Sequence, residues 1–269
     1  MKSRCHPQEA PRLETSESIG AFMVDGRRRV VMPLPDNDFD TTEAAVSWKA
    51  FVQSGCEVTF ATEYGRVAAC DQRLLSSGWL HPLPAQEEAV VAYDEMIQTA
   101  AFSSPITYRA IEADDFDAIH LSGGHAKGMR QYLDSTVLQR KVVDFVRADK
   151  LVGAVCHGVL VPARAIDPAT GKSVLDGRRV TTLTKPLEKW AFRTTVLRVG
   201  CRYRTYWKYT ETEVRAAVGT TGAMLRGETV ESPFIVEDGR FLTGRYPLDV
   251  ALYAETFVRM LADAHHQDA

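Results

Sequence analysis

The stretch KLVGAVCHGVLVPARA, from Lys150 to Ala165, places a cysteine directly before a histidine. A thiol beside an imidazole can act as a nucleophile with its general base, because the imidazole accepts the proton that the thiol loses. A free cysteine also packs in protein cores as a small apolar residue. On this dipeptide alone, Cys156 and His157 fit both interpretations.

The residues around Cys156 predict its place in a fold. The apolar run before it predicts a strand, and the small residues after it are compatible with a helix. Backbone N–H groups at such a strand-to-helix turn favour a thiolate. Gly158 allows the turn to be sharp, and we expect such a turn to present the cysteine side chain outward.

A second loop, SGGHAKGM from Ser122 to Met129, also follows a predicted strand. Gly123 and Gly124 allow backbone N–H groups to approach a ligand closely, and such donors stabilise a developing oxyanion. Ordinary turns use double glycines as well. The loop lacks the Gly-Lys-Ser/Thr ending of a phosphate-binding loop, so its pattern does not fit that kind of site.

Short apolar runs alternate with helical patterns along the chain. We predict strands at 28–35, 57–62, 116–124, 150–156 and 178–184, helices at 43–54, 137–146 and 248–262, and a hairpin at 233–244. Strands separated by helices imply right-handed crossovers, so we expect an α/β fold with a doubly wound, mostly parallel sheet and helices on both faces. Ligands of such sheets bind beyond the carboxyl ends of the strands, where both loops fall.

Composition excludes several classes of function. The chain has 269 residues and a formal net charge of −3, so we expect no affinity for nucleic acid or for an anionic membrane. The five cysteines lack paired C-x-x-C spacing, which argues against a disulfide framework and a structural zinc site and fits the cytoplasm. We interpret residues 1–26 as an N-terminal extension and 27–263 as one domain, with helices and loops inserted around 65–111.

Three motifs taken together resemble the ThiJ/PfpI superfamily, the class I glutamine-amidotransferase-like group. They are FDAIHLSGGHAKGMRQYLDS, LVGAVCHG and FDTTEAAVSWKAFVQSGCEVTFAT. The resemblance runs from about Arg28 to Leu261, is nearest to the heat-shock chaperone and glyoxalase III branch, and implies a flavodoxin-like fold. Ala126 and Val159 stand where many members of that branch have glycine and proline. These two differences affect which substrate is expected more than they affect which residue is expected to be the nucleophile.

The resemblance implies roles for individual residues. Cys156 matches the nucleophile, and the oxyanion donors match the Gly123-Gly124 loop, through Gly124, and the backbone of His157. Glu43 matches an acidic residue near the thiol, whose protonated form can donate to the thiolate and whose pKa is then raised. Alternatively, Glu43 is only a helix N-terminal acid favoured by the helix dipole.

The same branch places an acidic residue after the next strand, where it orients the histidine. Glu188 matches it here, and a carboxylate in that place would stabilise an imidazolium at His157. The alternative is a solvated glutamate between Lys185 and Lys189. For His125 we weigh a side chain that faces the pocket against a solvated loop residue.

Residues near the end of the chain are open to two readings. Arg245 either reaches the pocket and holds an oxygen anion or forms an ion pair with Asp249 at a helix start. The aromatic, basic tract 201–214 is expected to form a pocket wall or a dimer contact, with Trp190 and Trp207 narrowing the site. His120, inside a predicted strand, is expected to be a core residue.

These observations predict a cofactor-independent cysteine enzyme that acts on small reactive carbonyls. The branch it resembles suggests a glutathione-independent glyoxalase, which converts a 2-oxoaldehyde to a 2-hydroxy acid without a metal. The alternatives are an isonitrile hydratase, an amidase or peptidase with the same nucleophile, and a non-catalytic redox sensor or holdase chaperone. The resemblance also leads us to expect a homodimer.

Overall fold

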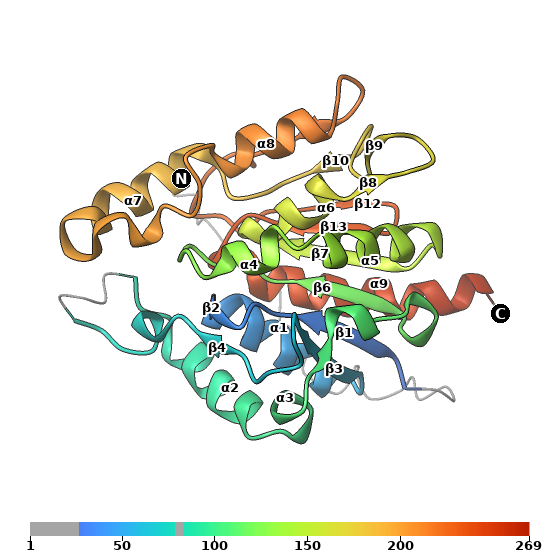
Figure 1. Ribbon diagram of the computed structural model, residues 1–269, viewed down its shortest axis with the longest axis horizontal. Helices are drawn as coiled ribbons and strands as arrows, with labels where there is room; N and C mark the ends of the chain where they lie inside the picture. The colour runs from blue at the N-terminus through green and yellow to red at the C-terminus, as the bar shows by residue number, and fades with distance from the viewer. Residues whose placement is uncertain (1–26, 79–82, 269) are drawn as a thin grey trace, which may run out of the picture.

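The computed structural model describes residues 27–78 and 83–268, which form a seven-stranded central sheet in the order β12-β13-β7-β6-β1-β3-β5 (Figure 1). Its strands are β1 (Arg29–Pro33), β3 (Glu57–Thr62), β5 (Ile106–Thr107), β6 (Ala118–Leu121), β7 (Leu151–Val155), β12 (Ile235–Asp238) and β13 (Phe241–Gly244). Every neighbouring pair is parallel except β12 with β13. The predicted doubly wound, mostly parallel α/β fold is therefore confirmed.

Helices cover both faces of the sheet, with α1 and α9 packed together on one face and α5 and α6 on the other (Figure 1). The helices are α1 (Thr41–Gln53), α2 (Glu87–Ile97), α3 (Ala100–Ser103), α4 (Met129–Leu133), α5 (Thr136–Arg147), α6 (Leu160–Arg164), α7 (Lys185–Val199), α8 (Thr210–Ala217) and α9 (Val250–Asp268). Three two-stranded pairs lie outside the main sheet: β2 (Asn37–Phe39) with β4 (Ala69–Cys70), β8 (Ile166–Asp167) with β9 (Lys172–Ser173), and β10 (Arg179–Val180) with β11 (Ala223–Met224).

The central strand β7 leads directly to the candidate nucleophile. All five of its residues are buried, as expected for a parallel strand that is covered on both faces and therefore reads as a continuous apolar run. Gly153 lies in its middle, where a Cβ would meet Tyr253 Oη and come within 2.5 Å of the Phe257 ring. The glycine thus lets the aromatic side chains of α9 pack directly on the strand.

Two expectations about the elements need correction. The predicted strand at 178–184 is a strand only at Arg179–Val180, and it pairs with β11 outside the central sheet. Beyond it, side chains make the hydrogen bonds: Thr182 Oγ1 donates to the carbonyl of Cys156 at 2.9 Å. The helix α7 was not predicted, because its residues do not form an apolar stripe along one face. The available signal for its start was Pro186, since proline is common in the first turn of a helix.

The region around 65–111 contains α2, α3 and the edge strand β5 of the central sheet, and its interpretation as an insertion into a single domain stays a prediction. Residues 1–26, interpreted as an extension, lie outside the described residues. Among the described helices, none combines the length and the apolar character that a membrane crossing requires. The cytoplasmic location and the homodimer stay predictions.

We expect Gly153→Ala to destabilise the protein by about 2 kcal/mol or more, because the added methyl overlaps two buried rings of α9. Gly244→Ala in β13 is the matched control, since its Cβ would meet Tyr253 and Val155 at an ordinary 3.6 Å. Urea unfolding of both variants measures the difference. Equal midpoints for the two variants would contradict this packing.

Candidate active site

Cys156 begins the turn that follows β7, and its backbone adopts a left-handed conformation with φ of 57°. This region is strained for a residue with a Cβ, and such strain persists only where the surroundings impose it. The chain then forms the 3₁₀ turn η4 (Cys156–Val159) and the short helix α6. The predicted sharp strand-to-helix turn is present, but the Cys156 side chain is fully buried, so the expectation of an outward-facing thiol is wrong for this state.

Gly123 explains how a second loop comes so close to this turn. A Cβ on Gly123 would lie 2.7 Å from the His157 nitrogen and 2.9 Å from both Cys156 Cβ and Glu43 Oε2. Only a residue without a side chain fits between these three groups. The loop after β6, the turn after β7 and the first turn of α1 therefore meet at one point.

Glu43 joins these segments through its carboxyl group. Its Oε2 accepts a hydrogen bond from the Gly123 N–H at 2.7 Å, and the carboxyl lies close enough to the Cys156 thiol for the two groups to shift each other's pKa. The N-terminus of α1 is capped by a different residue, since Asp40 Oδ1 accepts from the Glu43 N–H at 3.0 Å. The buried Glu43 side chain thus faces the thiol, as the resemblance implied, in addition to lying in the first turn of a helix.

Burial favours the neutral forms of both groups. It raises the pKa of Glu43 well above its usual value, an effect strengthened by the charge of Asp40 and opposed by the Gly123 N–H. Burial also raises the pKa of the Cys156 thiol, with the Glu43 and Asp40 charges adding to the shift and the backbone N–H of His157 opposing it. Both shifts favour a thiol beside a carboxylic acid in the closed site, which runs against the expected stabilised thiolate.

Two imidazoles flank the thiol. His157 Nδ1 lies 3.7 Å from Cys156 Sγ, and the rings of His125 and His157 meet edge to face with centroids 4.9 Å apart. Burial lowers the pKa of His157 well below its usual value, and it lowers the pKa of His125 to about 4. Both rings are neutral at neutral pH, so either can accept a proton. His125 is half-buried and faces the site, so the solvated alternative does not hold for it.

Glu188 does not contact His157, contrary to expectation. Its Oε1 accepts from Arg204 Nη1 at 2.6 Å and its Oε2 accepts from the Thr210 N–H at 3.0 Å. These bonds use the carboxylate to join α7 to α8, and His157 Nε2 has no hydrogen-bond partner among the described residues. The solvated alternative is wrong too, because Glu188 is only 2% exposed.

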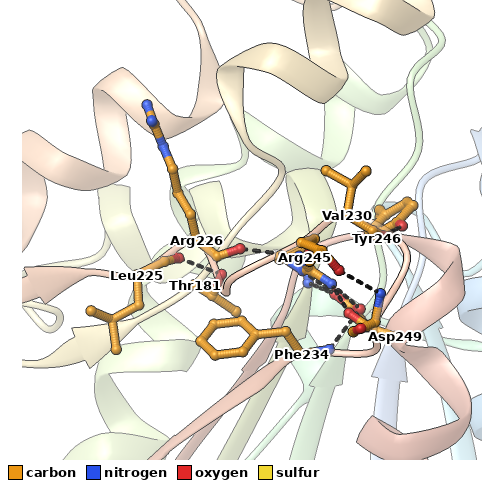
Figure 2. Close-up of polar contacts among 10 residues, drawn as sticks. Thr181, Leu225, Arg226, Val230, Phe234, Arg245, Tyr246 and Asp249 are labelled. Atoms are coloured by element: carbon orange, nitrogen blue, oxygen red, sulfur yellow. Dashed lines mark hydrogen bonds and ion pairs between the residues drawn. The ribbon is translucent and has the colours of Figure 1, made fainter.

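Arg245 does not reach the pocket either, and of the two readings the structure supports the ion pair. Its guanidinium is buried against Asp249, with Nε to Oδ2 at 2.9 Å and Nη2 to Oδ1 at 2.8 Å (Figure 2). The remaining N–H groups donate to the carbonyls of Arg226, Thr229 and Ser232. Since all these donors are satisfied, Arg245 holds the loop 226–232 against the end of β13 and cannot bind a substrate oxygen.

A cavity of about 480 Å³ opens beside the site. His125 is part of its wall, whereas the buried Cys156 is not, so the cavity does not extend to the sulfur in this structure. Trp190 and Tyr203 line it as expected, but Trp207 is 75% exposed and does not. His120 is a core residue as predicted, with Nδ1 2.8 Å from Tyr253 Oη.

Sequence reasoning did not place the four carboxylates of this wall, Asp38, Asp40, Asp71 and Glu88. Asp38 has a φ of 75° and accepts from the Gly128 N–H and from Arg202, so it ties the Gly-Gly loop to the tract 201–214. Burial raises the pKa of Asp40 to about 6. The signal was the acidic run DNDFD, which follows the first strand at the carboxyl edge of the sheet.

Arg245→Met is expected to lower the free energy of unfolding by about 3 to 5 kcal/mol, because it leaves Asp249 charged and buried without its ion-pair partner, with only two backbone N–H groups to stabilise it. Arg259→Met removes an exposed ion pair with Glu237 and is expected to cost about 1 kcal/mol or less. Chemical denaturation of both variants tests the contrast. A loss for Arg245→Met as small as that for Arg259→Met would refute the structural role.

Comparison with known proteins places this arrangement in a family. The ThiJ/PfpI family-like model matches residues 34–218. A glutathione-independent glyoxalase, HSP31, from Saccharomyces cerevisiae is 25% identical over 142 residues, which is 53% of this chain and only 58% of that protein. Glyoxalase 3 from Candida albicans is 23% identical over 237 residues, 88% of this chain and 92% of that protein.

A solved structure agrees at the level of the fold. The crystal structure of glyoxalase III from Candida albicans superimposes with a TM-score of 0.65 at 21% identity, covering 86% of this chain and 96% of the other. The matched family region contains the turn at Cys156, the Gly123-Gly124 loop and Glu43. The chain therefore belongs to the ThiJ/PfpI family-like proteins.

Proposed function

We propose that this protein is a cysteine-dependent enzyme that converts a small 2-oxoaldehyde to a 2-hydroxy acid without glutathione. The observation that carries the proposal is the buried contact of the Cys156 thiol with the Glu43 carboxyl and the His157 imidazole. Two relatives bear glyoxalase names, at low identity. A cysteine nucleophile can also attack an isonitrile or an amide, so both classes of compound should be tested as substrates beside the 2-oxoaldehyde.

The cavity fits a neutral carbonyl compound. Its described wall contains Asp38, Asp40 and Asp71 but neither lysine nor arginine. Carboxylates repel an anionic substrate, whereas the apolar remainder of the wall suits an uncharged one. The side chains over the sulfur, His125 first among them, must move for the carbonyl carbon to reach Cys156.

In the first step, the sulfur forms a bond to the aldehyde carbon while neutral His157 accepts the thiol proton. Protonated Glu43 donates a hydrogen bond to the sulfur while it is deprotonated, and the His157 imidazolium then passes its proton to the carbonyl oxygen, which gives a neutral thiohemiacetal and restores neutral His157. Transfer of the former aldehyde hydrogen, as a proton, to the neighbouring carbon then yields a 2-hydroxy thioester. Water cleaves the thioester, which releases the acid and restores the thiol, so no external oxidant or reductant is needed.

The rival reading as a peroxide sensor fits the site less well. Oxidation of a cysteine follows thiolate character and exposure. Cys156 is fully buried, and burial raises its pKa. A buried, neutral thiol is poorly suited to react with dilute peroxide and better suited to react with an electrophile bound next to it.

Purified protein is expected to convert methylglyoxal to lactate without added glutathione, and Cys156→Ala is expected to lower this rate by roughly a thousandfold or more. Cys201→Ala, which removes an exposed thiol, is the matched control and should retain the rate. Lactate is measured enzymatically over time. Turnover that survives in Cys156→Ala would rule out the proposed nucleophile.

The resting protonation state is open to a direct test. Because burial raises the pKa of Cys156, the ultraviolet difference spectrum between wild type and Cys156→Ala should show no thiolate step between about pH 5 and pH 8. The thiolate absorbance should increase only above about pH 8, since a thiol with a raised pKa ionises at higher pH. A thiolate step centred below about pH 7 would contradict the neutral resting site.

A further inference from the structure

Three potential metal ligands lie close together, at the strand-to-helix turn of Cys156 and in the Gly123-Gly124 loop next to it. His125, Cys156 and His157 each offer one ligand atom, and these atoms lie within 4.8 Å of one another. Ligand atoms on a four-coordinate zinc ion are separated by roughly 3.5 Å, as bonds of about 2.0 to 2.3 Å require. Small side-chain rotations would close the difference, and the loops that carry the ligands already touch through Gly123.

The histidines have unused coordination capacity. His125 Nδ1 and His157 Nε2 are both buried and have no hydrogen-bond partner among the described residues. Buried polar atoms without partners are uncommon, and an unoccupied ligand position is one explanation for them.

The wall of the cavity favours the approach of a cation. Asp38, Asp40, Asp71 and Glu88 line the same cavity as His125, and they outnumber the one arginine, Arg202, that pairs with Asp38 and Asp71. A concave surface lined by one sign of charge concentrates ions of the opposite sign. Of the three ligands, only His125 lines the cavity, whereas Cys156 and His157 are buried outside its wall.

We propose that Cys156, His125 and His157 bind a zinc ion, which blocks the nucleophile reversibly. One sulfur and two imidazole nitrogens suit zinc and leave its fourth position open to water. On binding, the S–H bond of Cys156 breaks, a sulfur–zinc bond forms and the proton passes to the solvent, with no change of oxidation state. Metal binding is independent of the proposed glyoxalase reaction, whereas the block on catalysis rests on that proposed function.

Cobalt is the probe for this site, because a sulfur–cobalt bond produces a strong charge-transfer band in the near ultraviolet. The reduced, chelator-treated full chain should show this band with one equivalent of Co²⁺, and Zn²⁺ should abolish it. Cys156→Ser should remove the band, and His125→Ala or His125→Asn should weaken cobalt binding by about tenfold or more. The double variant Cys5→Ser/Cys201→Ser should keep it, which controls for the exposed Cys201 and for Cys5, outside the described residues.

The outcomes separate the metal site from the proposed reaction. No charge-transfer band in wild type, a band that persists in Cys156→Ser, or unchanged affinity in both folded His125 variants would overturn the metal site. Zinc should also inhibit methylglyoxal turnover, and a chelator should restore it. A chain that turns over methylglyoxal but shows no band refutes only the metal site, and a chain with the band but no turnover refutes only the glyoxalase reaction.

Discussion

The buried carboxyl of Glu43 is the interaction on which the site depends. It joins the first turn of α1 to the loop after β6 through the Gly123 N–H, and to the turn after β7 through the Cys156 thiol. A carboxylate alone in this place would be costly to bury, so burial favours the protonated form of Glu43 beside a neutral thiol. In the proposed reaction, the site therefore starts with its protons in place instead of with a charged nucleophile.

The surrounding structure follows from that constraint. The left-handed backbone at Cys156 and the missing side chain at Gly123 allow three segments to approach one sulfur atom. The buried pairs farther out, Glu188 with Arg204 and Arg245 with Asp249, fix the walls of the cavity instead of taking part in chemistry. Each arginine is satisfied by a carboxylate and by backbone carbonyls, so neither is free for a ligand.

Short sequence patterns predicted those strands and turns whose structure depends mainly on residues close together in the chain. The apolar runs of β3 and β7 and the residues flanking Cys156 located strands and the turn, because burial on both faces and glycine geometry leave a clear mark in sequence. The resemblance supplied Glu43, since no spacing in the sequence links it to a cysteine more than a hundred positions away. The wrong role for Glu188 was assigned from its position in the chain alone. That position does not reveal the competing partner Arg204, which meets Glu188 because residues 185–199 form the unpredicted helix α7.

The burial of Cys156 could not be predicted from the sequence, because it arises where His125, Gly123 and Glu43 close over the sulfur. The acidic wall of the cavity likewise combines Asp38 and Asp40 with Asp71, from a separate loop. For the proposed reaction, the first feature requires the buried sulfur to become accessible, and the second favours uncharged or cationic molecules in the cavity.

The most direct test of the central claim is to stop the reaction with methylglyoxal by acid and to map the protein by peptide mass spectrometry. If Cys156 is the nucleophile, its peptide will carry the mass of one added methylglyoxal during turnover and lose it when the substrate is exhausted. Turnover with an unmodified Cys156 peptide, or an adduct confined to the exposed Cys201, would contradict the account.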